Sequence, residues 1–267
     1  MRKHYPASPK FKLFLATLCW SSLFGLNLQP ASAQIETVVN FDPPPMSSPG
    51  NREAGGQRSD TCVDTRDTTG LVALVPNTNV GLTTEASPNL LAYVPPNSAQ
   101  RAELRILKEV TGEEVFTGEV SLPEANTDLD YRYQAAILNM PLTSGAVVLE
   151  PDTNYLWALM LVCNSDNRAE DIVVDVIVQR IGEDYLNTLP SDITGPLANV
   201  SSFSGEDKLT AYSSAGVWHD LLLELSVLRQ ENPGLYESTW AGLLTNQGMD
   251  KIANAPIYES SLQPLNP

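Results

Sequence analysis

The chain has 267 residues, with 32 acidic and 16 basic side chains, and its net charge is −16 when the histidines are neutral. Nucleic acids and anionic lipids are therefore poor partners, because phosphate groups are bound by clustered Lys and Arg. The length allows one or two modest domains, and the simplest role of the acidity is solubility.

The first 33 residues are typical of a signal peptide. They begin with four basic residues: Arg2, Lys3, Lys10 and Lys12. An apolar run follows over residues 13–28, and the Ala-Ser-Ala triplet at 31–33 has the form that signal peptidase cuts. We expect a mature chain that begins at Gln34 and is periplasmic or secreted. A membrane anchor is the alternative, but the run is short for a span, so no span is expected after cleavage. Lipidation of Cys19 is a further, less favoured alternative.

Cleavage would leave 12 basic and 32 acidic residues, a net charge of about −20, and one histidine, His219. Two cysteines also remain, Cys62 and Cys163. In an oxidising compartment this pair predicts a disulfide. The bond would close a loop of about 100 residues and, in the chain-entropy model, stabilise the fold by up to roughly 4–5 kcal/mol. Two cysteines without a neighbouring histidine make a poor metal site, so we expect no metal and no cofactor.

Residues 34–69 are predicted to be a Pro/Gly-rich linker. The stretch FDPPPMSSPGNREAGGQRSD, residues 41–60, is rich in Pro, Gly, Ser and charge and offers little to bury. Such segments are extended or disordered unless something tethers them. Cys62 is the candidate tether.

Residues 70–181 are predicted to form an immunoglobulin-like antiparallel β-sandwich. Short apolar runs recur between turn residues, which is typical of an all-β fold. Residues 101–109 alternate, with Ala102, Leu104 and Ile106 on one face and charged residues on the other. The expected strands are 71–76, 90–96, 101–109, 113–120, 131–138, 155–163 and 170–180.

The run 155–163 is apolar on both faces, so we expect a central strand covered on both sides. Its first residue, Tyr155, lies where immunoglobulin-like domains carry a tyrosine whose hydroxyl bonds the backbone a few residues upstream. We therefore expect a contact with residues 149–151; the alternative is an ordinary core tyrosine. Trp157 is expected to be structural as well. Because Cys163 ends its strand, its disulfide should join the linker to the rim of the sandwich.

Residues 182–257 are predicted to be helical and residues 258–267 a tail. A short helical turn is expected over 182–189, a loop over 189–207, and one long amphipathic helix over 209–230. Asn232 and Pro233 are typical of the start of another helix, and Gly248 of its end. We expect the two long helices to form a C-terminal hairpin that packs on or beside the sandwich.

Many of these residues occur together in one known family. They are Phe41-x-Pro43-Pro44, Arg52, Gly55-Gly56, Arg58, Ala73-Leu74-Val75-Pro76, Gly81-Leu82-Thr83, Pro88, Tyr93-Val94-Pro95, Leu149, Tyr155, Trp157, Cys163, Arg180 and Gly216-Val217-Trp218-His219-Asp220. In their order and spacing they resemble the cyanobacterial domain of unknown function 928 family. The resemblance implies a cyanobacterial, exported protein and transfers no functional residues. That family more often has a tyrosine than a histidine after the tryptophan.

The segment 216–220 is the strongest candidate for a site. A catalytic role would make His219 a general base oriented by Asp220. Neighbouring helical side chains point about 100° apart, and no Gly-x-Ser-x-Gly sequence supplies a nucleophile. We therefore assign no catalytic residue and expect Trp218 to anchor the helix on the sheet, with Asp220 facing water. Trp218, His219 and Asp220 remain weak candidates for binding.

Two acidic loops are candidates for calcium. One contains Asp128 and Asp130, and the other contains Asp166, Glu170 and Asp171. Calcium needs six to eight converging oxygen ligands, and no EF-hand spacing is present. Solvated loops are the favoured interpretation, and we expect no metal site.

These features favour an exported, non-enzymatic envelope or secreted interaction module whose partner is a protein or a glycan of the cell envelope. The argument is one of fold analogy. A periplasmic hydrolase that acts on cell-wall or extracellular polymer through acidic residues is the alternative, because carboxylate pairs come from distant positions in a sequence. A structural role in an envelope assembly is a third possibility.

Overall fold

The computed structural model describes residues 1, 39–54, 62–64, 66, 69–125, 130–142 and 147–265. The chain divides into two units, residues 1–34 and 35–267, and the following description concerns the second unit. The predicted signal peptide lies outside the described residues. Among those that are described, no helix is long and apolar enough to cross a bilayer.

The second unit is rich in β-structure and contains two sheets. The larger sheet has the strand order β10-β5-β4-β7-β8-β2. Its strands are β2 (Val80–Thr83), β4 (Arg101–Lys108), β5 (Glu114–Val120), β7 (Asn154–Val162), β8 (Ile172–Arg180) and β10 (Leu262–Pro264). The smaller sheet has the order β1-β3-β6-β9. Its strands are β1 (Val72–Ala73), β3 (Asn89–Val94), β6 (Ala136–Pro141) and β9 (Ile257–Glu259).

The two sheets share one hydrophobic core, because alternate side chains of both contribute to the same buried cluster. Ala102, Leu104 and Ile106 of β4 are completely buried in it, as their alternation predicts. On the opposite face of β4, Glu103 is also buried, and it accepts hydrogen bonds from Arg101 (2.6 Å) and Arg168 (2.8 Å). These bonds lower the pKa of Glu103 in spite of burial, which acts to raise it.

Strand β7 has the central position predicted for it, between β4 and β8. Tyr155 and Trp157 are buried in the core between the sheets. The Tyr155 hydroxyl accepts a hydrogen bond from the backbone N–H of Glu150 at 3.1 Å. This is the upstream backbone contact that the sequence predicts, and it holds the chain where it enters β7.

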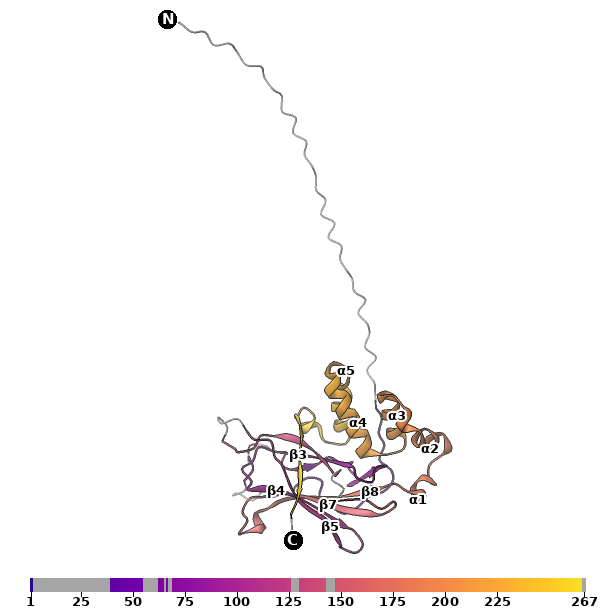
Figure 1. The fold of residues 1–267 in the computed structure, drawn as a ribbon, viewed down its shortest axis with the longest axis horizontal. Helices are drawn as coiled ribbons and strands as arrows, with labels where there is room; N and C mark the ends of the chain where they lie inside the picture. Colours follow the sequence, from indigo (N-terminus) through magenta and orange to yellow (C-terminus); the bar gives the residue numbers. More distant parts are fainter. Residues whose placement is uncertain are drawn as a thin grey trace. The chain divides into compact units, whose positions relative to one another are not determined.

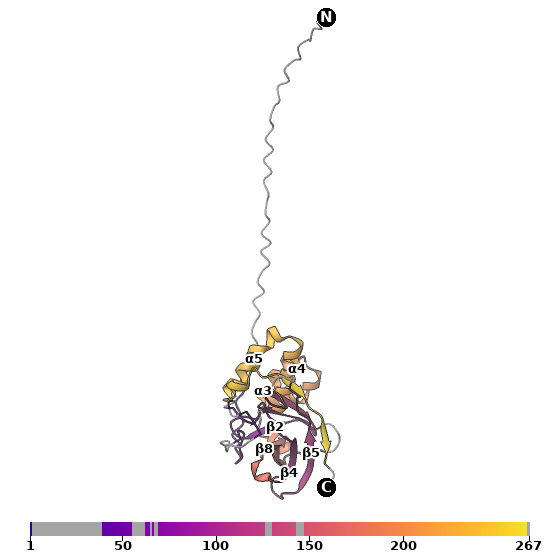
Figure 2. The same cartoon turned by 90° about the vertical axis from the view of Figure 1, so that its left-hand side faces the viewer.

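The outer face of the smaller sheet is covered by helices, which form a second hydrophobic cluster with it. The helices are α1 (Glu183–Leu186), α2 (Ser191–Ala198), α3 (Gly205–Ser214), α4 (Trp218–Glu231) and α5 (Pro233–Asn246). Three short 3-10 segments are η1 (Arg168–Glu170), η2 (Val200–Ser202) and η3 (Asp250–Ile252). In Figure 1 and Figure 2, α3, α4 and α5 lie together on one side of the strands. The smaller sheet therefore lies between the larger sheet and the helices.

Two strand pairs depart from the antiparallel prediction. β2 pairs in parallel with β8, and β6 pairs in parallel with β9. The first pair arises because the predicted strand 71–76 is much shorter than expected. The chain leaves the smaller sheet after β1, passes Pro76 and Asn79, whose φ is +62°, and joins the larger sheet as β2. Pro76 has no N–H to continue a ladder.

The helical prediction is wrong at two points, and the first is that residues 209–230 are not one helix. Gly216 has a φ of +69°, which favours glycine, and it separates α3 from α4. The stretch predicted as a loop contains α2, with Pro196 inside it. The start of α5 follows the prediction, with Asn232 as N-cap and Pro233 at the first position. Gly248, with a φ of +75°, follows its C-cap.

Described residues near both ends of this unit belong to the folded body, in contrast to the predicted linker and tail. In the linker region, Val39 and Phe41 are buried in the helical cluster. Arg52 donates to the carbonyl of Gln247 at 2.7 Å. In the predicted tail, β9 and β10 add edge strands to both sheets. Tertiary pairing rather than local sequence preference accounts for these short elements.

A disulfide joins Cys62 and Cys163, as the sequence predicts. The Cα atoms of Cys62 and Cys163 are 5.2 Å apart. Cys163 follows directly after the last residue of β7, and Cys62 precedes β1 in the chain. The bond therefore connects the N-terminal region to the end of a central strand.

Candidate functional site

The segment 216–220 connects the helices to both sheets. It begins with the left-handed turn at Gly216 and continues into the first turn of α4. Trp218 is completely buried, and its indole N–H donates to the carbonyl of Leu74 at 2.8 Å. The ring of Phe41 packs edge-on against it, with the ring centroids 4.8 Å apart. Trp218 thus anchors α4 on the smaller sheet, which is the structural role expected for it.

His219 is packed against β2. Its side chain is 2 % exposed, and a methyl group on Gly81 would lie 2.3 Å from the imidazole Nε2. Neither imidazole nitrogen has a hydrogen-bond partner among the described residues. Burial lowers the pKa of His219 to about 4. The imidazole is therefore neutral at physiological pH, with one nitrogen able to donate and the other to accept.

Asp220 does not face water, which corrects the prediction. It is 7 % exposed, and its carboxylate accepts hydrogen bonds from the backbone N–H (3.2 Å) and the hydroxyl of Thr84. Burial raises the pKa of Asp220 to about 6, although the bonds from Thr84 and Thr83 act in the opposite direction. The side chains of Asp220 and His219 point in different directions from the helix, as expected for adjacent residues. The Asp220 carboxylate is nevertheless buried, because Thr84, which follows directly after β2, covers it. Asp220 thereby ties α4 to the chain that leaves β2.

His219 and Asp220 line a cavity of about 330 Å³, which we call the polar cavity. Its wall is completed by the connection from β2 to β3 and by α3 and α4, through Glu85, Ser87, Asn89, Tyr212, Leu223 and Glu224. Tyr212 supplies an aromatic wall, and burial together with the charge of Asp220 raises its pKa to about 12. Glu224 is paired with Lys208 at 3.2 Å. The polar cavity thus combines an aromatic ring with carboxylate, amide and imidazole groups.

Covalent catalysis by a hydroxyl or thiol has little support in this cavity. Ser87 is the serine in its wall, and the Ser87 hydroxyl donates to the carbonyl of Val147 at 2.6 Å rather than to His219. Cys62 and Cys163 are joined to each other. Nucleophilic catalysis needs a nucleophile within hydrogen-bond reach of a base. The groups present can hold a polar ligand, and burial raises the pKa of the Asp220 carboxyl to about 6.

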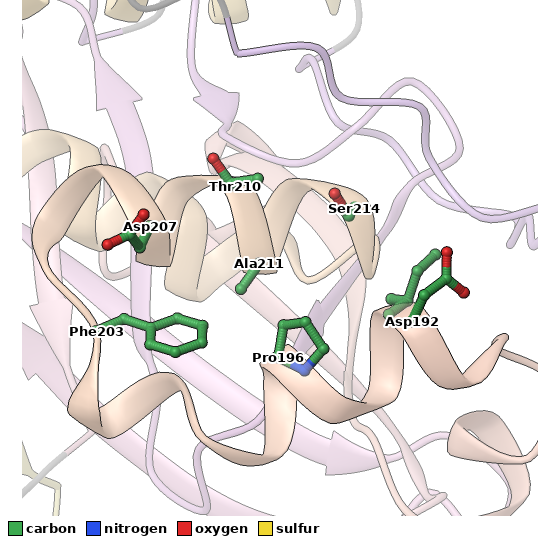
Figure 3. A pocket seen from close by; sticks show the side chains of 8 residues that line it. Asp192, Pro196, Phe203, Asp207, Thr210, Ala211 and Ser214 are labelled. Carbon is green, nitrogen blue, oxygen red and sulfur yellow. The ribbon is translucent and has the colours of Figure 1, made fainter.

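A second hollow lies between α2 and α3 and has a volume of about 660 Å³. We call it the α2–α3 groove. Figure 3 shows the rings of Phe203 and Pro196 and the methyl group of Ala211 facing the space between the helices. Asp192 lies toward one end of the groove and Asp207 toward the other. The groove therefore has an apolar interior with carboxylates at its margins.

The acidic loops are organised by neighbouring polar groups. Asp171 pairs with Arg168 at 2.6 Å, and Glu170 accepts a hydrogen bond from the amide of Asn167 at 2.6 Å. Asp130 lies 3.6 Å from Arg66, and Asp128 is outside the described residues. Within the part of the chain that the structure describes, no group of three or more His, Cys, Asp or Glu is placed to hold a metal ion.

The polar cavity could not be predicted from the sequence, because its wall comes from separate segments of the chain. Leu223 is a helical neighbour of both His219 and Asp220, and Glu224 is a neighbour of Asp220, since residues three and four apart lie next to each other on a helix. The sequence did contain one indication of the cavity: polar residues, His219 and Asp220, occur within an otherwise apolar stretch of a buried helix. The residues from the β2–β3 connection carried none, because β2 itself was not among the predicted strands.

Comparison with known proteins gives one match. No curated protein and no solved structure matches the chain. The family model described as Domain of Unknown Function (DUF928) matches residues 53–257, which is well over half of the sequence and includes both the polar cavity and the α2–α3 groove. The chain therefore belongs to the Domain of Unknown Function (DUF928) family.

Proposed function

We propose that this protein is an exported, non-enzymatic module of the cell envelope or the secreted fraction, and that it binds a glycan in the polar cavity. The observation that carries this proposal is the combination of an aromatic wall, Tyr212, with the carboxylate of Glu85 and the amide of Asn89 in a cavity of about 330 Å³. Ligand sites of this volume are common, and a few convergent polar groups give them specificity.

The chemistry of the wall suits a ligand with many hydroxyl groups. Each sugar hydroxyl donates one hydrogen bond and accepts others. The carboxylate of Glu85 accepts, and the side-chain amide of Asn89 offers both functions. The apolar face of a sugar ring can pack against Tyr212.

The sequence and the strand order support the remaining parts of the proposal. The signal-peptide pattern and the Cys62–Cys163 disulfide both favour an oxidising compartment outside the cytoplasm. We take the fold to be an immunoglobulin-like sandwich, in which β1-β3-β6 corresponds to strands A-B-E and β4-β7-β8 to C-F-G. The hydrogen bond to Tyr155 supports this arrangement. We take α4 and α5, which Asn232 alone connects, to be the C-terminal hairpin.

A hydrolase is the second candidate, because one observation favours it. Asp220 is buried, lines the polar cavity and has its pKa raised to about 6. Carboxylic acids with raised pKa values act as general acids in glycoside hydrolysis, with a second carboxylate as base or nucleophile. Glu85 and Glu224 line the same cavity. The binding role is preferred, because the Asp220 carboxylate is already engaged by Thr84.

One experiment separates the two candidates. The purified protein is titrated calorimetrically with cell-wall and extracellular oligosaccharides, and the same samples are assayed for new reducing ends. We expect binding without turnover. Glu85→Gln and the cavity-filling Leu223→Trp should weaken this binding, whereas Glu119→Gln on β5 should leave it unaffected. Turnover that Asp220→Asn abolishes would replace the proposal with a hydrolase. Absence of binding to every glycan class tested would refute both.

A further inference from the structure

The α2–α3 groove leaves apolar side chains uncovered on the surface of the helical layer. Phe203 and Pro196 are only half-buried, although both lie among the helices that cover the smaller sheet. Their rings lie next to each other on the α2 side of the groove, and Ala211 of α3 lies opposite them (Figure 3). An apolar hollow with polar margins is a common form of interaction site. The cavity volume of about 660 Å³ is large enough for bulky side chains.

The charge around the groove is strongly negative. Residues 183–214 contain five carboxylates and a single basic residue, Lys208. Lys208 is already paired with Glu224, on the side of the polar cavity. The two carboxylates that line the groove, Asp192 and Asp207, are both exposed. Complementary potentials steer association and select partners, so the occupant should be positively charged at its margins and apolar at its centre.

We propose that the α2–α3 groove binds a peptide segment of a partner protein in which an aliphatic or aromatic side chain is flanked by Lys or Arg. The apolar side chain fills the space between Ala211 and the rings of Phe203 and Pro196. The flanking cations lie beside Asp192 and Asp207. A second copy of this chain would bring the same acidic face, and an anionic membrane surface would be repelled. This inference is independent of glycan binding in the polar cavity, because the two sites have different linings.

The test uses three short fluorescent peptides and the purified protein, with binding followed by anisotropy. The first peptide combines Lys with Leu and Phe, the second replaces each Lys by Glu, and the third replaces each Leu and Phe by Ser. We expect only the first to bind, with an affinity that falls as salt increases. Removing both carboxylates with Asp192→Asn and Asp207→Asn should weaken binding about two- to thirty-fold, the range for two exposed ion pairs.

A matched double variant controls for net charge. Glu119→Gln with Asp166→Asn removes the same charge from exposed positions on β5 and on the loop after β7, and it should leave the affinity unchanged. Phe203→Ala should weaken the first peptide without altering glycan binding. Equal loss in both double variants would show that general acidity, not the groove, attracts the peptide. Tighter binding of the acidic peptide, self-association that Phe203→Ala abolishes, or a preference for anionic vesicles would overturn the proposal.

Discussion

The contact between Gly81 and His219 makes a sharp prediction about how α4 is attached to the sheets. In a Gly81→Ala variant the new methyl group would lie 2.3 Å from Nε2, 2.8 Å from Cδ2 and 3.1 Å from Cε1 of the imidazole. Favourable contacts between such atoms begin at about 3.5 Å. The ring cannot swing into solvent, because it is 2 % exposed and the adjacent Trp218 holds the start of α4. Either β2 or α4 must move.

The cost of this movement can be bounded. Overpacking a well-filled site destabilises a protein by about 1–3 kcal/mol. The backbone at Gly81 does not have the positive φ that favours glycine, so no conformational penalty is added. In a His219→Ala background the same substitution meets no ring and should cost close to nothing. The two changes should therefore show a coupling free energy of about 1–3 kcal/mol, the size seen for residues in contact.

Urea unfolding followed by tryptophan fluorescence measures this cycle. Gly242→Ala on α5 is the matched control, because a methyl group there meets no atom within 4 Å. It should stabilise the protein by about 0.5–1 kcal/mol, as alanine does in a helix. If Gly81→Ala costs the same with and without the histidine ring, the packing described for His219 is wrong. A Gly81→Ala variant as stable as the parent would have the same meaning.

Three further predictions concern the same framework. Unfolding takes up a proton at His219, whose pKa burial lowers to about 4, and releases one from Asp220, whose pKa burial raises to about 6. In Asp220→Asn, where His219 still titrates, the unfolding free energy should therefore rise as the pH increases from 4 to 6.5. In His219→Gln, where Asp220 still titrates, it should fall as the pH increases from 4 to 6. Urea titrations in which both variants show the same pH dependence would contradict this. Reduction of the Cys62–Cys163 disulfide, which closes a loop of 101 residues, should lower the unfolding free energy by up to about 4–5 kcal/mol, and an unchanged urea midpoint after reduction would argue against the bond. Trp218→Phe should cost about 1–3 kcal/mol, because it leaves a buried carbonyl without its donor, and a variant as stable as the parent would contradict the anchoring role.

The larger strands and their inward faces could be predicted because burial imposes a period of two on their sequence. The alternation in β4 and the doubly apolar run of β7 correctly identified the side chains of the core and the central position of β7. The Tyr155 contact was predictable for a related reason, since both partners lie within a few residues of each other. A sequence pattern therefore predicts structure where two contacting residues are close in the chain, or where one whole face of a strand is buried.

The short strands could not be predicted from their own residues. β2, β9 and β10 have three or four residues each, and they exist because β8, β6 and β5 offer edges to pair with. The break between α3 and α4 carried a visible signal, Gly216, but an isolated glycine within an apolar stripe does not reveal a positive φ. Tertiary context decided both cases.

The burial of Asp220 was missed for the same reason. Helical phase places its side chain away from the apolar stripe, which predicts exposure to water. The chain leaving β2, distant in sequence, covers the carboxylate and supplies its hydrogen bonds through Thr84. A single sequence does not show which loop will lie over a helix face, so the polar cavity emerged only from the arrangement of the elements.

The segments that lie outside the family match, at both ends of the chain, are needed in any fragment made to isolate this fold. The boundaries of the family match, residues 53 and 257, cut through the folded body. A fragment trimmed to them would lose Phe41 from its place against Trp218 and would strip β10 from the edge of β5. Uncovered strand edges invite self-association, so such a fragment should precipitate where the chain from residue 39 onward does not.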